Sequence, residues 1–188
     1  PLHPGFEMHP YKGLLQNNNG TWAANSVEKL AILNIPIYLS VNKEQYLQYQ
    51  QLFNCHQLIE DATTLPIGGP LKGILSAHLL HSKSSIFVLA CDLQSIDTAV
   101  LHYLAKAFRI HTHSDAIVFT NEQEVEPLCG IYSSKALATI ANKLQHAQLQ
   151  KHSMKYVLEK MNTTVLPLPS EWTPYFKNYN YKTDIATE

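Results

Sequence analysis

Apolar residues along this chain alternate between two spacings, and the alternation is clearest from about Ser26 onward. Short runs rich in β-branched residues are followed by longer segments in which apolar residues recur every three or four positions. The short runs predict strands and the longer periodic segments predict helices. Strands that alternate with helices are typical of an α/β fold built on a mainly parallel sheet.

The expected elements follow one another along the chain. The pattern predicts strands over residues 37–41, 57–60, 86–91, 116–120, 128–132 and 164–166. It predicts helices over residues 26–33, 43–53, 71–81, 97–110, 134–144 and 153–161. Residues 86–91 (IFVLAC) form the most apolar run. A run of this length suits a strand that is covered on both faces, so we expect it at the centre of the sheet.

Composition and charge narrow the class of protein. A domain of about 150 residues already buries close to 70% of its unfolded surface, so we expect the 188 residues to form one domain over residues 1–188. The net charge of −1, from 14 basic and 15 acidic residues, disfavours nucleic acid and membrane partners, because both require an excess of Lys and Arg. No apolar run reaches the roughly 20 residues that cross a bilayer, and no basic-then-apolar leader opens the chain. We therefore expect a cytoplasmic protein.

Cysteines and histidines do not indicate a metal centre. Cys55, Cys91 and Cys129 are widely spaced and form no CxxC pair, so the sequence supports neither a disulfide framework nor a zinc site. The ten histidines include no HExxH motif. We expect them to be solvated residues of loops and helices.

Polar residues follow three of the predicted strands. They are Asn42, Asp61 and Asp92. Ligands of open α/β sheets bind beyond the carboxyl ends of the strands, so these positions are candidates for a binding site. Asp92 is the strongest, because a carboxylate after a buried strand can ligate Mg²⁺; the alternative is that it caps the next helix or forms hydrogen bonds within a loop. For Asn42 and Asp61 a turn-forming role is preferred to a functional one.

A glycine-rich segment, GGPLKG at residues 68–73, opens a predicted helix. The exposed N–H groups of a helix start favour anions. The spacing matches neither the P-loop nor GxGxxG, so a simple tight turn is the alternative interpretation.

Taken in order, a set of motifs resembles the molybdenum cofactor guanylyltransferase family, which belongs to the wider nucleotidyltransferase fold. The motifs are KGLL from Lys12, LSVNK ending in Lys43, LIED ending in Asp61, GGPLKGILSA at residues 68–77, VLACD ending in Asp92, EPLCGIY at residues 126–132 and FKNYNYKTD at residues 176–184. The resemblance covers about residues 8–187. It implies a Rossmann-like three-layer α/β/α sheet whose strands are mostly parallel.

The resemblance also implies a reaction and its participants. GMP would pass from GTP to molybdopterin cofactor with release of pyrophosphate, and positioning, cations and Mg²⁺ would stabilise the transfer without a covalent intermediate. Asp92 would hold Mg²⁺ and Lys12 would contact the triphosphate, which makes both catalytic. The implied nucleotide-binding residues are Lys12, Asn42, Asp61, Leu71 and Gly73, and the implied molybdopterin-binding residues are Asn178 and Asn180. Further implied partners are cofactor-receiving molybdoenzymes or other cofactor-maturation proteins.

The sequence departs from the family pattern in three places. Members open with a strand and a glycine-rich loop, GGxSxRMGxDK, whereas Lys12 is here preceded by PLHPGFEMHPY, with no glycine pair and no Arg. The usual PCDxP reads ACDLQ at residues 90–94, and Lys43 stands where Arg is common. Because the loss of a central strand would leave the ladder groups of its neighbours unpaired, we expect the full polypeptide to contain this strand and loop.

Two alternatives to a guanylyltransferase stay open. One is a transferase of the same fold for another nucleotide or acceptor, such as a cytidylyltransferase. The other is a non-catalytic homologue that binds a nucleotide or a pterin and has lost the phosphate loop.

Overall fold

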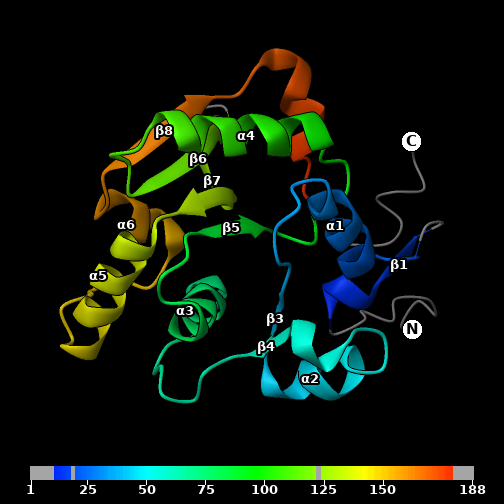
Figure 1. Cartoon of the computed structure of the whole chain (residues 1–188), viewed down its shortest axis with the longest axis horizontal. Helices are drawn as coiled ribbons and strands as arrows, with labels where there is room; N and C mark the ends of the chain where they lie inside the picture. Colours follow the sequence, from blue (N-terminus) through cyan, green and yellow to red (C-terminus); the bar gives the residue numbers. More distant parts are fainter. Residues whose placement is uncertain (1–10, 18–19, 122–123, 180–188) are drawn as a thin grey trace, which may run out of the picture.

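Helices and strands alternate along the chain, as the hydrophobic pattern predicts (Figure 1). The computed structural model describes residues 11–17, 20–121 and 124–179. The elements, with η for 3-10 helices, are η1 (Lys12–Leu14), β1 (Gln16–Asn17), β2 (Gly20–Thr21), α1 (Trp22–Ala31), β3 (Leu39–Val41), α2 (Lys43–Tyr49), η2 (Cys55–Gln57), β4 (Leu58–Glu60), α3 (Pro70–Leu80), β5 (Ile86–Leu89), α4 (Thr98–Ile110), β6 (Ala116–Asn121), β7 (Glu124–Tyr132), α5 (Ser134–Gln145), α6 (Met154–Glu159), β8 (Thr163–Pro167) and η3 (Ser170–Phe176). The expected α/β class is confirmed.

Side-chain caps determine where several helices begin. The side chains that accept a hydrogen bond from a backbone N–H of the first turn are those of Thr21, Asn42, Asp97, Ser133 and Ser153. Such caps satisfy N–H groups that have no partner within the helix. The helix α1 begins at Trp22, earlier than the hydrophobic pattern predicts, because Thr21 caps it there.

The largest sheet has the strand order β5-β7-β6-β8. The strands β6 and β8 pair in parallel, whereas β7 is antiparallel to both β5 and β6. Three of the four strands therefore run in one direction and β7 is reversed. A second, parallel pair consists of β3 and β4, and β1 and β2 form a short antiparallel pair.

The expected central position of residues 86–91 is wrong among the described strands, because β5 pairs only with β7 and lies at one edge. Its coverage on both faces is confirmed, since Ile86 and Val88 pack against one apolar cluster and Phe87 and Leu89 against another. An apolar run indicates that both faces of a strand are covered, but it does not indicate which strands pair.

Within the described residues, β3 pairs only with β4, so β3 and β5 each have one edge without a neighbouring strand. The helix α3 contacts β3, β4 and β5 and so spans the two sheets. The further strand expected from the sequence stays a prediction.

Two large apolar cores lie on opposite faces of the main sheet (Figure 1). The first gathers residues of α3, α5 and α6, among them Leu75, Leu137 and Val157. The second gathers residues of α4 and η3, among them Leu104 and Phe176. Helices thus cover both faces, which gives the three layers expected from the sequence.

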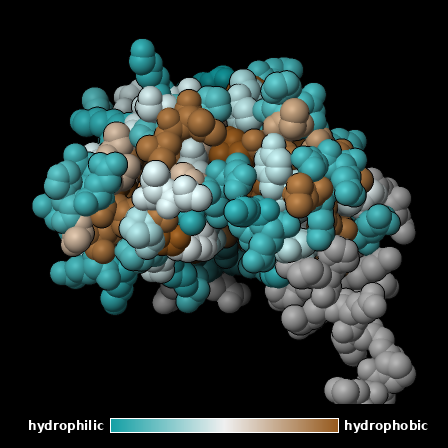
Figure 2. Space-filling model, turned by 90° about the horizontal axis from the view of Figure 1, so that it is seen from below, coloured by the Kyte–Doolittle hydropathy of each residue, from teal (hydrophilic) through white to brown (hydrophobic). Residues whose placement is uncertain are grey.

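A third, smaller apolar cluster joins η1, α1, β3, α2 and β4 near the start of the described chain. Seen from below, the surface is largely hydrophilic, and apolar residues are separated into several areas (Figure 2). Among the residues with described coordinates, no helix has both the length and the apolar character needed to cross a membrane.

Candidate functional site

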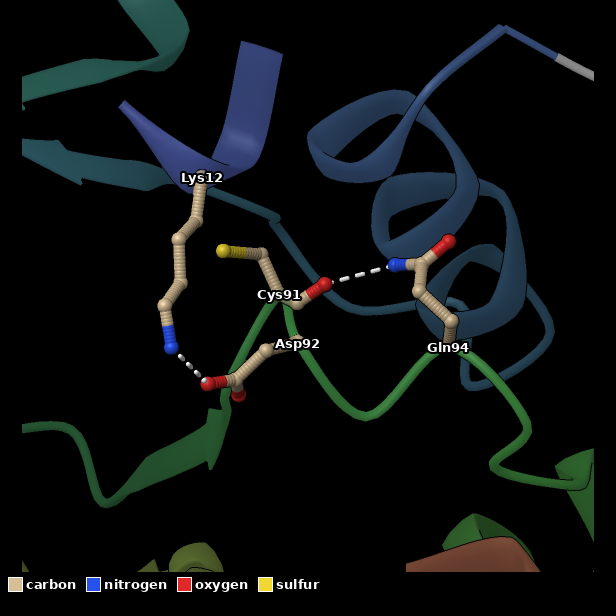
Figure 3. Close-up of polar contacts among 4 residues, drawn as sticks. All are labelled: Lys12, Cys91, Asp92 and Gln94. Carbon is tan, nitrogen blue, oxygen red and sulfur yellow. Dashed lines mark hydrogen bonds and ion pairs between the residues drawn. The ribbon is translucent and has the colours of Figure 1, made fainter. Parts of the chain in front are cut away.

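Lys12 and Asp92 form an ion pair just beyond the carboxyl end of β5 (Figure 3). The Nζ atom of Lys12 lies 3.2 Å from Oδ2 of Asp92, although the two residues are 80 positions apart. The side chains are 45% and 22% exposed, so both stay accessible to a ligand. The fold therefore brings together the two residues that were expected to be catalytic.

The turn that carries Lys12 packs closely against α2. A Cβ atom at Gly13 would lie 2.2 Å from the hydroxyl oxygen of Tyr49, so this approach requires a glycine. Leu14 and Tyr49 are both buried in the third apolar cluster. Burial also raises the pKa of Tyr49, which keeps its hydroxyl neutral. The backbone position of Lys12 is thus determined by packing rather than by its own ion pair.

A cleft of about 360 Å³ opens beside Asp92. Its lining residues are Ala90, Asp92, Leu93, Glu126, Pro127, Leu128 and Asn178. A second hollow, of about 630 Å³, is lined by Gly68, Gly69, Pro70, Pro127, Leu128, His152, Ser153, Met154 and Lys155. The two hollows share Pro127 and Leu128 and therefore adjoin over β7. Sites for small molecules commonly enclose about 300–1,000 Å³, so the pair is large enough for a nucleotide and part of a second substrate.

Asn178, to which the resemblance gives a role in molybdopterin binding, lines this cleft, because the chain around it is hydrogen-bonded to the Asp92 loop. The backbone N–H of Tyr179 donates to the carbonyl oxygen of Asp92 at 3.1 Å. The hydroxyl groups of Tyr179 and Ser95 are hydrogen-bonded at 2.7 Å. Asn180, which was predicted beside Asn178, lies outside the described residues.

Glu126 is a cleft residue to which the sequence analysis gave no role. It lies on β7 and lines the same cleft as Asp92. Burial is the main cause that raises its pKa, and the negative charges of Glu124 and Asp92 add to the effect, whereas Lys155 opposes it. The available signal was an acidic residue next to the apolar strand of the EPLCGIY motif.

Asn42 lies at the end of β3, where it caps α2. Its Oδ1 atom accepts from the N–H of Gln45 at 2.8 Å, and its own N–H donates to Oε1 of Gln45 at 2.9 Å. This reciprocal pair is a capping box. The turn-forming role is therefore present, and a role in nucleotide binding stays a prediction.

Asp61 follows β4 and lies beside the first turn of α3. Its N–H donates to the carbonyl oxygen of Val41 at 2.9 Å, which extends the pairing of β4 with β3. Burial raises the pKa of Asp61, while the charge of Lys72 and a hydrogen bond from Ser40 act in the opposite direction. The carboxylate thus sits in a partly desolvated place with a hydroxyl donor and a cation nearby.

Leu71 and Gly73 lie near the start of α3, and their expected role in nucleotide binding stays a prediction. The side chain of Leu71 is fully buried in the first core, so only its backbone could meet a ligand. A Cβ atom at Gly73 would lie 2.3 Å from Oγ of Ser40 and 3.6 Å from Oδ1 of Asp61. The missing side chain of Gly73 therefore makes room for Ser40 beside Asp61. Ser40, which the sequence analysis missed, packs against Gly73 and forms a hydrogen bond with Asp61, so it connects β3 with the start of α3.

The acidic residues of the cleft suit a magnesium ion that also binds water and phosphate better than a metal ion that is bound by protein side chains alone. In the described ranges no cluster of three or more His, Cys, Asp and Glu side chains could hold a metal ion. Magnesium usually takes one or two carboxylates and completes its shell with water and substrate phosphates. Asp92, with Glu126 lining the same cleft, could supply such a donor set.

Comparison with known proteins assigns most of the chain to a single family. Residues 5–164 match the model of the MobA-like NTP transferase domain. A probable molybdenum cofactor guanylyltransferase of Flavobacterium johnsoniae is 29% identical over 177 residues, which cover 92% of this chain and 85% of the relative. A probable molybdenum cofactor guanylyltransferase of Clostridium perfringens is 30% identical over 130 residues, which cover 65% of this chain and 60% of that relative.

Solved structures share the fold. Molybdopterin-guanine dinucleotide biosynthesis protein A from Archaeoglobus fulgidus superposes with a TM-score of 0.74 at 19% identity, over 94% of this chain and 87% of that protein. A cytidylyltransferase from Leptospira borgpetersenii gives a TM-score of 0.67 at 14% identity, over 97% of this chain and 80% of that protein. These likenesses establish an α/β nucleotidyltransferase fold.

Proposed function

This chain belongs to the family of MobA-like NTP transferase domains, and from that premise we propose that it transfers GMP from GTP to molybdopterin cofactor and releases pyrophosphate. The observation that carries the proposal is the Lys12–Asp92 pair at the mouth of a cleft lined also by Glu126 and Asn178. Support for the base and the acceptor comes from the two curated relatives, both described as probable molybdenum cofactor guanylyltransferases.

The reaction is a substitution at phosphorus. An oxygen of the terminal phosphate of molybdopterin attacks the α-phosphorus of GTP and forms a new P–O bond. The bond from the α-phosphorus to the bridging oxygen of the β-phosphate breaks, and pyrophosphate leaves. Two polyanions must therefore be held in line, which the protein can achieve by positioning and by placing cations.

Lys12 supplies a mobile cation at this place. The ammonium group of a lysine is a compact charge on a flexible stem, so it can exchange a carboxylate for a phosphate oxygen. Its ion pair with Asp92 keeps it at the cleft before substrate binds. In the proposed complex Lys12 binds the triphosphate and stabilises the charge that passes to pyrophosphate.

Asp92 is the proposed holder of Mg²⁺, with Glu126 as the second carboxylate of the same cleft. When bound, the ion supplies Lewis-acid stabilisation of the charge on the phosphate oxygens. The chain contributes the orientation of Asp92, which is set by β5 on one side and by the bond from Tyr179 to its carbonyl oxygen on the other.

The base and the pterin are assigned to separate groups of residues, of which only Asn178 lines the cleft beside Asp92. Asp61 and Asn42, at the ends of β4 and β3, are the proposed contacts of guanine and ribose, together with the backbone of residues 71–73. Asn178 is the proposed contact of molybdopterin, because an amide can both donate to and accept from the edge of a heterocycle. Asn180 is assigned to the same side on the sequence motif alone.

Mass spectrometry of the reaction product tests this proposal. Purified protein is incubated with molybdopterin, Mg²⁺ and either GTP or CTP. A product heavier than molybdopterin by one GMP unit, formed with GTP and not with CTP, supports the proposal. A product with CTP alone identifies a cytidylyltransferase, and no product with either nucleotide indicates a non-catalytic homologue; both outcomes contradict it.

A further inference from the structure

Gln94 lies two residues after Asp92, and its side-chain amide makes four hydrogen bonds. The amide NH₂ donates to the carbonyl oxygens of Cys91, at 2.6 Å, and Trp22, at 3.3 Å. The amide oxygen accepts from the side-chain amides of Asn17, at 3.3 Å, and Asn25, at 3.2 Å. A primary amide offers two donor hydrogens and two acceptor sites, so Gln94 uses its full capacity.

The partners of Gln94 come from two separate segments of the chain. Cys91 directly precedes Asp92, whereas Asn17, Trp22 and Asn25 follow the turn that carries Lys12. Gln94 therefore ties the loop of the carboxylate to the segment of the cation. In Figure 3 Lys12 and Gln94 lie on opposite sides of the Cys91–Asp92 backbone, and the carbonyl group of Cys91 points to Gln94.

The backbone of Gln94 strengthens the same connection. Its carbonyl oxygen accepts a hydrogen bond from Nζ of Lys29, on α1. The side chain of Lys29 reaches into a partly desolvated space, and this burial lowers its pKa. Both the side chain and the backbone of Gln94 are thus bound to α1.

We propose that Gln94 is a positioning residue, whose amide fixes the Cys91–Asp92 backbone against the segment of Lys12 and so sets where the Asp92 carboxylate meets a bound magnesium–nucleotide complex. This inference rests on the proposed function. Residue 94 is also where the family motif PCDxP has proline. A proline restrains a loop through its ring, whereas Gln94 restrains it through hydrogen bonds to two segments.

Alkylation of cysteines tests the positioning without any substrate. Cys91 is half-buried next to Asp92, Cys55 is exposed and Cys129 is buried, so the chain contains its own controls. In Gln94→Leu we expect iodoacetamide to modify Cys91 about tenfold faster, as measured by peptide mass spectrometry, because the loop opens locally. The rates at Cys55 and Cys129 stay unchanged. An unchanged rate at Cys91 overturns the proposal.

A second variant separates local loosening from general unfolding. Gln94→Glu keeps the oxygen that accepts from Asn17 and Asn25 but lacks the hydrogens donated to Cys91 and Trp22. If Gln94→Leu also accelerates the modification of Cys129, the result for Gln94→Glu decides between local loosening and general unfolding. Faster modification of Cys91 alone supports the proposal, and equal acceleration of Cys91 and Cys129 contradicts it.

Calorimetric binding of magnesium–GTP tests whether Gln94 acts through Asp92. We expect Gln94→Leu to weaken binding about tenfold in the wild-type background and less than about twofold in Asp92→Asn, because residues that act together are not additive. Gln51→Leu, at an exposed position after α2, is the matched control with unchanged affinity. An equal loss in both backgrounds would reduce Gln94 to a general structural role and overturn the proposal.

The two tests also distinguish failure of this inference from failure of the proposed function. If the wild type binds magnesium–GTP but forms no product with molybdopterin, the proposed function fails, and the binding and alkylation results still decide the role of Gln94. If the wild type binds no nucleotide, Gln94 no longer positions Asp92 for one, and the inference falls together with the function.

Discussion

The backbone N–H of Tyr179 donates to the carbonyl oxygen of Asp92 at 3.1 Å, which fastens the C-terminal part of the described chain to the loop of the proposed metal ligand. The hydroxyl group of Tyr179 forms a second hydrogen bond, with Ser95, and the residue is 1% exposed. Asn178 is carried into the cleft by this attachment. The proposed pterin and phosphate subsites are therefore linked through one residue.

Tyr179→Phe removes the hydroxyl group and keeps the ring. We expect the KM for molybdopterin to rise about fivefold, since loss of a hydrogen bond costs about 1 kcal/mol and loosens the chain at Asn178, while the KM for GTP stays unchanged. Steady-state kinetics with each substrate varied in turn measures this difference. Tyr175→Phe is the matched control, and an equal rise of both KM values argues against the link.

Gly13→Ala tests whether the turn that carries Lys12 packs against Tyr49. The added methyl group would lie 2.2 Å from the hydroxyl oxygen of Tyr49, so we expect the free energy of unfolding to fall by about 1–3 kcal/mol in urea titrations. Adding Tyr49→Phe relieves the clash and recovers part of the loss. Gly68→Ala has no atom within 4 Å of the new Cβ and is the neutral control. A Gly13→Ala protein as stable as the control would show that the turn is not packed in this way.

Asp61→Asn tests the partly desolvated carboxylate by its pH dependence. The folded-state pKa of Asp61 is raised above the ordinary value of 3.8, so its favourable contribution is present below that value and is lost as the pH rises through the folded-state pKa. We therefore expect wild type to lose stability relative to Asp61→Asn as the pH rises from 4 to 7 in urea titrations.

Glu124→Gln should show the opposite dependence of stability on pH in the same titrations. The hydrogen bond and charge of Lys155 lower the pKa of Glu124, so its contribution is present above the ordinary value of 4.5 and is lost as the pH falls through the folded-state pKa. Wild type should lose stability relative to Glu124→Gln only as the pH falls. The same sign for both variants contradicts the assignment for Asp61.

Asn42→Asp separates capping from base binding. Aspartate retains the oxygen that accepts from Gln45, so thermal stability should change little, whereas Asn42→Ala should cost about 1 kcal/mol through loss of the cap. If the amide of Asn42 also donates to the nucleotide, GTP affinity falls about tenfold in both variants. GTP affinity that is unchanged in Asn42→Asp leaves Asn42 as a cap alone.

Much of this fold follows from local sequence signals. Ser133 and Ser153 precede periodic apolar segments, and both cap helices as such residues do. Asp92 was identifiable because a polar residue after an apolar strand marks the edge where ligands bind. These signals lie within a few residues of one another, so no knowledge of the tertiary structure is needed to interpret them.

The remaining features depend on contacts between distant segments. The partners of Gln94 on β1 and α1 are 77 and 69 positions away, and nothing near residue 94 indicates them. Gly73 lies in a motif that suggests ligand contact, yet its missing side chain accommodates Ser40 from another strand. Among the described strands β5 lies at an edge because it pairs only with β7, and hydrophobicity does not encode this pairing.

Release of pyrophosphate is the most direct test of the proposed chemistry. Wild type, Asp92→Asn and the exposed control Lys106→Met are each supplied with GTP, Mg²⁺ and molybdopterin, and pyrophosphate is measured over time. We predict release by wild type and the control at the same rate, and a loss of about 100-fold or more in Asp92→Asn, because a metal-holding carboxylate supplies several kcal/mol of transition-state stabilisation. No release by wild type, or equal release by Asp92→Asn, would contradict the account.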